Sequence, residues 1–333
     1  MLDIELFREE PGKIKESEKR RDKDPERVDE VIEIDEEWRE ARQKADSLRA
    51  ERNEMSEKIG EKKQAGEDAE EEIQRVQEIK EEIAELEGRE KELKEERDEL
   101  RYKIGNILHE SVPKGEDEED NVEVSKWGEK PGHDFDVIPH ADAVKELDLA
   151  DTSKASEVTG SRFYYLKNEL VALNLALQRF ALDKLVERGY TPMQTPYMLG
   201  HDAMSSAAEL EDFEEQLYGI EGENWYLIAT SEQTLASYHY DEILEPDDLP
   251  LKYAGVSSCF RREAGSHGKD TKGIFRVHQF EKVEQYVFCE PENSWDLYEE
   301  LRKNFEEIFR ELDIHYRIVN VCTGDMNDNA AKK

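Results

Sequence analysis

The chain has 333 residues, with 84 acids against 47 Lys and Arg residues and a formal net charge of -37. A general nucleic-acid binder is not expected to have this balance, because phosphates would be repelled at long range. The acids are spread along the whole chain, which favours a solubility role in a salt-rich cytosol over an acidic site for cationic partners. The expected source is therefore halophile-like.

Cysteine spacing argues against a disulfide-rich or zinc-binding protein, and hydropathy argues against a membrane-spanning one. The three cysteines lie far apart in the sequence and give neither a disulfide framework nor the spacing of a zinc site. No segment approaches the roughly 18 apolar residues of a membrane span. We therefore expect a cytoplasmic protein with no membrane association and no metal site built from its own side chains.

Residues 26 to about 108 have the composition of long helices, with no proline after Pro25. Apolar residues recur in steps of three and four from Val31 to Ile59 and again from Val76 to Ile107, and Gly60 and Gly66 bracket the break. The pattern predicts two helices that fold back on each other as an arm about 50 Å long. Periodicity alone favours a dimerisation coiled coil over such an arm.

The composition changes again after the arm. Residues 113–132 combine an acidic run with Pro and Gly and are predicted to be a linker. Beyond it, short β-rich runs outnumber the helices that could connect them in parallel, which favours an antiparallel sheet with helices packed on it. The predicted class is α+β, with an N-terminal domain over 1–112, an arm over about 27–107, and a second domain over 133–333.

The window 259–285 carries six Lys and Arg against four acids in this very acidic chain. We expect 256–262 and 274–287 to be extended and the turn-rich basic segment between them to be a long loop. Alternation along the second strand then places five side chains on one face: Arg276, His278, Phe280, Lys282 and Glu284. Such a face suits a polyphosphate nucleotide, although a solvent-exposed face with salt bridges is the alternative.

The same window, FRREAGSHGKDTKGIFRVHQFEKVEQ, closely resembles motif 2 of the class II aminoacyl-tRNA synthetases in the form found in seryl-tRNA synthetases, of the bacterial type. Residues 187–198, ERGYTPMQTPYM, are similar to motif 1 of that class, with Pro196 at the position of the motif's proline. Residues 230–235, TSEQTL, resemble the TxE loop that reads the amino acid. The N-terminal residues and the arm match too, so the resemblance covers essentially the whole chain.

The resemblance implies an activity and its partners. ATP would activate L-serine to seryl-adenylate, with Mg²⁺ sharing the charge, and the seryl group would pass to the 3′ end of tRNA(Ser). Whether selenocysteine tRNA is also charged stays open. A homodimer would form through motif 1 around Pro196, and the arm would bind tRNA.

The resemblance also implies roles for individual residues. The implied catalytic residues are Arg261, Glu263 and Arg276. The implied ATP-binding residues are Arg261, Arg262, Glu263, Val277 and Phe280. The implied serine-binding residues are Thr230, Ser231, Glu232 and Glu284. The motif 2 loop cations His267, Lys269 and Lys272 lie where the family meets pyrophosphate or the acceptor end, and the expected tRNA-binding cations of the arm are Arg49, Arg52, Lys58, Lys62 and Lys63.

Other functions remain compatible with these residues. A synthetase paralogue could load an amino acid onto another acceptor, although the long arm argues against it. A non-catalytic coiled-coil interaction protein is a second alternative, against which the set Arg261, Glu263, Phe280 and Glu284 weighs. Charging of serine-specific tRNA distinguishes the first alternative, and ATP binding distinguishes the second.

The sequence stops before the position of the family's motif 3, which supplies a second ATP-binding Arg. We therefore expect a protein of residues 1–333 alone to activate serine poorly or not at all. ATP–pyrophosphate exchange with the purified protein measures this, and robust exchange would contradict the expectation.

Overall fold

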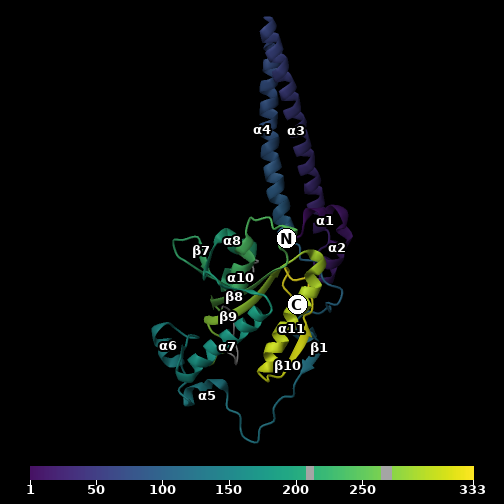
Figure 1. Cartoon of the computed structure of the whole chain (residues 1–333). Helices are drawn as coiled ribbons and strands as arrows, with labels where there is room; N and C mark the ends of the chain where they lie inside the picture. The colour runs from purple at the N-terminus through teal and green to yellow at the C-terminus, as the bar shows by residue number, and fades with distance from the viewer. Residues whose placement is uncertain (208–213, 264–271) are drawn as a thin grey trace. The chain divides into compact units, whose positions relative to one another are not determined.

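The computed structural model describes residues 1–207, 214–263 and 272–333. The chain divides into two compact units, one formed by residues 1–126 with 317–333 and the other by residues 127–316. Figure 1 labels the elements of both. His267 and Lys269, predicted to face pyrophosphate or tRNA, lie outside the described residues. Within the described residues, no helix is long and apolar enough to cross a membrane.

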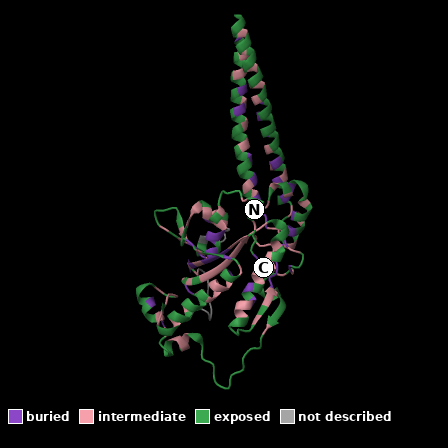
Figure 2. Cartoon of the chain, in the orientation of Figure 1, coloured by how far each residue is buried: buried purple, intermediate pink, exposed green. Residues whose placement is uncertain are grey.

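The predicted arm is present as α3 (Arg27–Ala65) and α4 (Glu70–Tyr102), which run back along each other (Figure 1). Helix α3 ends where Gly66 takes a left-handed φ of 75° and its N–H bonds to the carbonyls of Lys62 and Lys63. Glycine adopts this conformation without steric cost, so the break falls at one of the two predicted glycines. Leu48, Ile79 and Ile83 form part of the narrow buried seam, and most of the remaining arm surface is exposed (Figure 2).

The second helix is shorter than expected, because it ends at Tyr102 rather than near Ile107. The chain turns away to pack against α2 (Pro11–Arg20). The Gly105 N–H donates to Glu18 Oε1 at 3.1 Å, and a Cβ at Gly105 would lie 2.7 Å from Arg21 Nε. The Gly105 backbone can lie this close to the Arg21 side chain because glycine has no Cβ. The segment after Tyr102 therefore packs against α2 and does not form the last turn predicted for the helix.

A buried ion network joins the base of the arm to α1 (Ile4–Glu9). The Asp35 side chain is 1% exposed and accepts hydrogen bonds from Arg8, at 2.8 Å, and from Arg97 Nη1, at 2.9 Å. The Arg97 guanidinium also lies 5.0 Å from the centroid of the Trp38 ring. Arg39 also donates to Asp35, at 3.1 Å. The buried charges are tolerated because the carboxylate and the arginines compensate one another.

The first unit also contains residues that the sequence predicts to be a linker. Within 113–132 the structure has a 3₁₀ turn, η1 (Glu118–Asp120), and strand β1 (Val122–Trp127), which pairs with β10 (Tyr316–Asn320). Strand β10 is followed by Val321 and Met326, which form a small core with Leu108 and Val112. The apolar side chains that hold this sheet are 200 residues apart in the sequence, so local composition could not reveal it.

The second unit is built on a three-stranded sheet. Strand β8 (Leu251–Phe260) lies between β4 (Thr191–Gln194) and β9 (Gln279–Phe288). The β8–β9 pair is antiparallel, as predicted, but β4 runs parallel to β8, so the sheet is mixed. Strands β4 and β8 can run in parallel because the long connection of residues 195–250 returns the chain to the same end of the sheet. Helix α7 (Asn168–Glu187) precedes β4 and covers one face of the sheet, where Leu185 and Tyr190 pack with Ala254.

The remaining elements of this unit surround the sheet. Helix α11 (Ser294–Glu311) packs on α7, and α10 (Ser231–Ala236) contacts β8 and β9. A second small sheet has the order β5 (Met198–Gly200), β7 (Trp225–Leu227), β6 (Tyr218–Gly219). The other elements are α5 (His140–Glu146), β2 (Ala150–Asp151), α6 (Thr152–Val158), β3 (Tyr165–Leu166), α8 (His201–Ala207), and the short turns η2 (Glu214–Gln216), η3 (Ser237–His239), η4 (Pro246–Asp248) and η6 (Pro291–Asn293). This unit confirms the α+β class.

Replacing Asp35 by Asn should lower the free energy of unfolding by about 3 kcal/mol, because Arg8 and Arg97 lose their only shared buried carboxylate. Burial opposes ionisation of Asp35, but the hydrogen bonds from the two arginines outweigh it and hold the pKa of the carboxyl below its usual 3.8. A lowered pKa stabilises the fold above the usual value and loses this contribution as pH falls towards the folded-state pKa. The difference between wild type and Asp35→Asn should therefore shrink below about pH 3.8.

Denaturant unfolding at several pH values measures this difference. The matched control is Asp46→Asn, which removes an exposed partner of Arg49 and should cost less than about 1 kcal/mol. Equal effects of the two substitutions would contradict a special role for the buried network.

Candidate active site

The register of β8 and β9 decides which side chains share a face. Gly255 lies opposite Glu284, Ser257 opposite Lys282, and Cys259 opposite Phe280. Residues directly opposite each other in an antiparallel pair project to the same side of the sheet. Phe280, Lys282 and Glu284 therefore share one face, as the alternation in the sequence predicts.

Both strands are shorter than predicted at the end nearest the basic loop. Strand β9 begins at Gln279 rather than Ile274, and β8 ends at Phe260 rather than Arg262. The backbone N–H of His278 bonds to the Arg162 carbonyl at 3.1 Å instead of continuing a ladder, and that of Arg262 bonds to the Gln216 carbonyl at 2.8 Å. Arg276 and Glu263 therefore lie on irregular segments outside both strands. The alternation of side chains along a strand does not decide which face of the sheet they occupy.

Helix α10 lies against this face and presents Thr230 at its N-terminus. The Thr230 side chain caps the helix by accepting from the Glu232 N–H at 3.3 Å. A Cβ at Gly255 would lie 2.9 Å from Leu235 Cδ1, so the absence of a side chain there lets α10 approach. Ser231 is fully buried, and its hydroxyl is 2.8 Å from that of Ser257. Its side chain therefore fastens the helix to β8 and does not line the open face.

A polar cluster forms where α10 meets β9. The Thr230 hydroxyl donates to Glu284 Oε2 at 3.0 Å and accepts from Lys282 Nζ at 2.8 Å. Lys282 also forms an ion pair with Glu284. Lys282 is absent from the residues proposed from the sequence, although the alternation put it on this face. Its position in the sequence, midway between Phe280 and Glu284 on the same face of the strand, was the signal that could have identified it.

A second cluster lies at the other end of the same face. The Arg261 guanidinium is 5.2 Å from the centroid of the Phe280 ring, and its Nε donates to the Ala229 carbonyl at 3.2 Å. Glu263 Oε2 is 3.2 Å from Arg276 Nη1. The structure thus brings four of the predicted residues together in two pairs, Arg261 with Phe280 and Glu263 with Arg276, and each pair joins the two sides of the loop.

The cluster can accept a ligand that is anionic at one end and planar at the other. A guanidinium resting on an aromatic ring is held weakly enough to turn towards phosphate or carboxylate oxygens, and the ring face is then available to a planar base. Val277, also predicted near the nucleotide, is buried at 5% exposure. Burial raises the pKa of the Cys259 thiol, which disfavours the thiolate, so the cysteine on this face is not poised as a nucleophile.

The predicted tRNA-binding cations of the arm are partly committed to acids. Arg49 bonds to Asp46 at 2.5 Å and to Glu87 at 2.8 Å, and Lys62 pairs with Glu72. The hydrogen bonds that Arg49 donates to Glu87 and Asp46, and Lys62 to Glu72, raise the pKa values of Arg49 and Lys62. Arg52 contacts the Asn53 side chain at 3.4 Å, while Lys58 and Lys63 are exposed near the end of α3. A phosphate would have to replace a carboxylate at Arg49 and Lys62.

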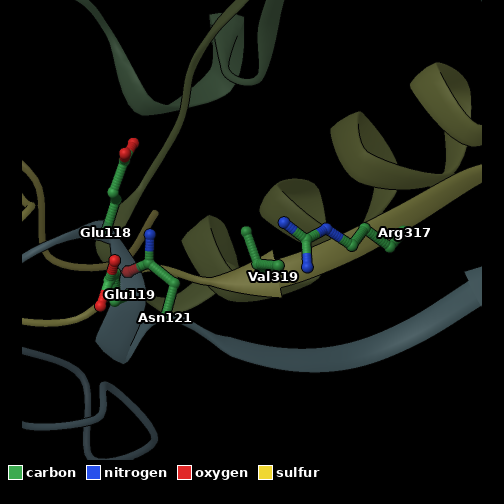
Figure 3. A pocket seen from close by; sticks show the side chains of 5 residues that line it. All are labelled: Glu118, Glu119, Asn121, Arg317 and Val319. Atoms are coloured by element: carbon green, nitrogen blue, oxygen red, sulfur yellow. The ribbon is translucent and has the colours of Figure 1, made fainter.

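The first unit contains a hollow of about 420 Å³. It is lined by Glu118 and Glu119 of η1, by Asn121, and by Arg317 and Val319 of β10 (Figure 3). Asn121 is already engaged, because its amide bonds to Asp325 at 2.8 Å and accepts from the Cys322 N–H at 2.8 Å. No residue proposed from the sequence lines this hollow.

Replacing Gly255 by Ala should displace α10 and lower the free energy of unfolding by about 1–2 kcal/mol, because the added methyl group overlaps Leu235. The control is Gly200→Ala, where nothing lies within 4 Å of the new Cβ. Thermal unfolding measures both variants. A Gly255→Ala protein as stable as Gly200→Ala would contradict the proposed tight contact between α10 and β8.

Comparison with known proteins places these features in a wider context. Residues 1–108 match the model of the seryl-tRNA synthetase N-terminal domain, and residues 215–333 match that of the tRNA synthetase class II core domain (G, H, P, S and T). The chain is 49% identical over 333 residues to the serine-tRNA ligase of Methanosphaera stadtmanae, covering 100% of this chain and 78% of the relative. It is similar to the crystal structure of seryl-tRNA synthetase from Pyrococcus horikoshii complexed with ATP (TM-score 0.91, 45% identity, 100% of this chain, 79% of that one).

A second solved structure gives the same relationship. The cytoplasmic serine-tRNA ligase from Naegleria fowleri in complex with AMP has a TM-score of 0.87 at 36% identity, over 100% of this chain and 80% of that chain. Both of these structures contain an adenine nucleotide.

Proposed function

This chain belongs to the seryl-tRNA synthetase family, and we propose that the shared face of β8 and β9 is the site where it activates serine with ATP. Its relatives are serine-tRNA ligases, and this activity is that of the present chain. The observation that carries the site assignment is the meeting, on one face, of Arg261 and Phe280 with Thr230 and Glu284. One end suits a nucleotide, and the other suits a small hydroxylated amino acid.

The nucleotide half consists of Arg261, Glu263, Arg276 and Phe280. Adenine would stack on the Phe280 ring, and the Arg261 guanidinium would leave that ring for the α-phosphate and the serine carboxylate. Glu263 would hold the adenine side, and its ion pair with Arg276 would keep both charges in place before ATP arrives. Val277 would line the pocket, and Arg262 and Lys272 would lie near the phosphates.

The serine half consists of Thr230, Glu232 and Glu284. A carboxylate accepts from both the ammonium and the hydroxyl group of serine, and an amino acid without the hydroxyl would leave it unsatisfied. Lys282 occupies the same cluster in the free protein. Serine ammonium would replace Lys282 as the partner of Glu284, so this lysine holds the Glu284 side chain in position until the substrate binds.

The reaction needs no nucleophile from the protein. The serine carboxylate attacks the α-phosphorus, the bond from the α-phosphorus to the bridging oxygen breaks, and pyrophosphate leaves. The terminal ribose hydroxyl of the tRNA then attacks the seryl carbonyl carbon, the bond to the adenylate oxygen breaks, and AMP leaves. The side chains act by positioning the reactants and by stabilising the charge that develops on the phosphate. Mg²⁺ fits as a companion of ATP, because it is typically held by substrate phosphates with few protein ligands, and it would neutralise charge on the leaving pyrophosphate.

The dimer and the tRNA contacts are separate parts of the proposal. Helix α7, which leads into the motif 1 segment and Pro196, leaves Val171, Leu173, Leu175 and Leu177 between 40% and 61% exposed. Val171 and Leu175 lie on one side of the helix and Leu173 and Leu177 on the opposite side. Large apolar side chains left this exposed suit burial in a homodimer interface. The arm would pack against tRNA(Ser), and the cytoplasm is the location in which this reaction would take place.

Replacing Glu284 by Gln should raise the KM for serine by about 10- to 100-fold, because a charge-assisted hydrogen bond to the substrate is lost. The KM for ATP should change much less. The control is Glu281→Gln, three residues away on the opposite face of β9, where the carboxylate accepts from Ser258 at 2.9 Å. ATP–pyrophosphate exchange by the full-length enzyme measures both constants, and equal serine KM values in the two variants would contradict the assignment.

The exposed arm cations give a second prediction. The double substitution Lys58→Glu with Lys63→Glu should weaken tRNA binding about tenfold or more. The slope of the logarithm of the binding constant against the logarithm of salt concentration should fall by the amount expected for about two lost phosphate contacts. Lys91→Glu with Lys94→Glu, which makes the same charge change nearer the base of the arm, is the control. Filter binding at several salt concentrations measures both, and equal weakening would indicate general repulsion instead of a contact near the arm's tip.

A further inference from the structure

The two limbs of the basic hairpin are joined at their root by a third segment, residues 161–163. The Arg162 carbonyl accepts from the His278 N–H at 3.1 Å, on the limb that leads into β9. The Arg162 Nη1 donates to the Glu263 carbonyl at 2.9 Å, on the limb that leaves β8. A single residue therefore bridges the two ends of the loop.

The backbone at both ends of this bridge has an unusual conformation. Arg162 has a φ of 62° and Glu263 a φ of 51°. Side chains other than glycine enter this left-handed region rarely, because the Cβ crowds the backbone. Such residues persist where their surroundings hold them. The bond from Arg162 to Glu263 is one such restraint, and it acts on the residue whose carboxylate faces Arg276.

The next residue in the segment supports the other limb. The Phe163 ring stacks on His278, with centroids 5.0 Å apart and an interplanar angle of 30°. His278 Nδ1 lies 2.8 Å from the Arg261 carbonyl and 3.0 Å from the Tyr218 hydroxyl. The Arg261 N–H in turn donates to the His278 carbonyl at 2.9 Å. The position of the Arg261 backbone thus depends on a ring that Phe163 holds in place.

We propose that Arg162 is a positioning residue for the nucleotide half of the active site, acting through Glu263 and, with Phe163 and His278, through Arg261. The inference rests on the proposed roles of Arg261 and Glu263 in ATP binding. Arg162 does not contact the reacting atoms. It fixes the backbone from which the two nucleotide-binding side chains extend.

Substitution of Arg162 should affect the use of ATP and the recognition of serine differently. Thr230 belongs to the N-terminus of α10, and Glu284 lies within the paired part of β9. Neither depends on the bridge at the root of the loop. Loss of the Arg162 guanidinium removes the bond to the Glu263 carbonyl but keeps the Arg162 backbone carbonyl that accepts from His278. The support of Arg261, which would also contact the serine carboxylate, is therefore retained. The use of ATP should weaken through Glu263, and serine recognition should stay nearly unchanged.

The test uses the full-length enzyme with Arg162→Ala, Arg162→Lys and the control Lys154→Ala, which removes an exposed cation of α6 that pairs only locally with Glu157. In ATP–pyrophosphate exchange, Arg162→Ala should raise the KM for ATP about tenfold and that for serine less than threefold, since one charged hydrogen bond is lost. Arg162→Lys, which retains a charged donor, should recover part of the loss. Lys154→Ala should match wild type.

Two results would overturn the proposal. One is an unchanged KM for ATP in Arg162→Ala. The other is an equal rise for both substrates together with a lower Tm and no recovery in Arg162→Lys, which would mean a structural role only. Arg261→Ala, assayed in parallel, tests the proposed function itself. If it too leaves ATP use unchanged, the site assignment fails; if it impairs ATP use while Arg162→Ala does not, only the role of Arg162 fails.

Discussion

The register between β8 and β9 is the constraint on which the rest of the site depends. It sets Gly255 opposite Glu284 and Cys259 opposite Phe280, so that the strand with small residues lies beneath α10 while its partner supplies the larger functional side chains. A slip of one residue would turn Phe280, Lys282 and Glu284 to the side that packs on α7. The buried contacts of Ala254 with Leu185 on that side oppose such a slip. Packing on the face that contacts α7 thereby determines which side chains of β9 project from the opposite face.

Charge compensation is the second feature that the parts of the molecule share. In the site, Glu284 is paired with Lys282 and Glu263 with Arg276; at the base of the arm, Asp35 is paired with Arg8 and Arg97. In the site, substrates would exchange with these partners instead of meeting bare charges, which lowers the reorganisation needed when they bind. At Asp35 no exchange is expected, because the carboxylate is buried. The same kind of pair thus serves binding in one unit and stability in the other.

The sequence predicted well what depends on local periodicity. The arm, its break near Gly66, and the shared face of Phe280, Lys282 and Glu284 follow from periods of 3.6 and 2. Predictions from the sequence failed where the structure depends on contacts between segments far apart in the chain. Strand β1 pairs with β10 across nearly 200 residues, β4 adds to the sheet in parallel, and Arg162 captures the backbone where β9 was expected to continue. The contact between the Ser231 and Ser257 hydroxyl groups also joins residues far apart in the sequence and could not be predicted from it.

The measurement that tests the account most directly is a crystal structure of the full-length protein with ATP. The account predicts that adenine lies on the Phe280 ring and that the Arg261 guanidinium has left this ring to hydrogen-bond the α-phosphate, with Glu263 still beside Arg276. A nucleotide bound elsewhere, or one that leaves Arg261 on Phe280, would contradict the assignment of this face as the site of serine activation.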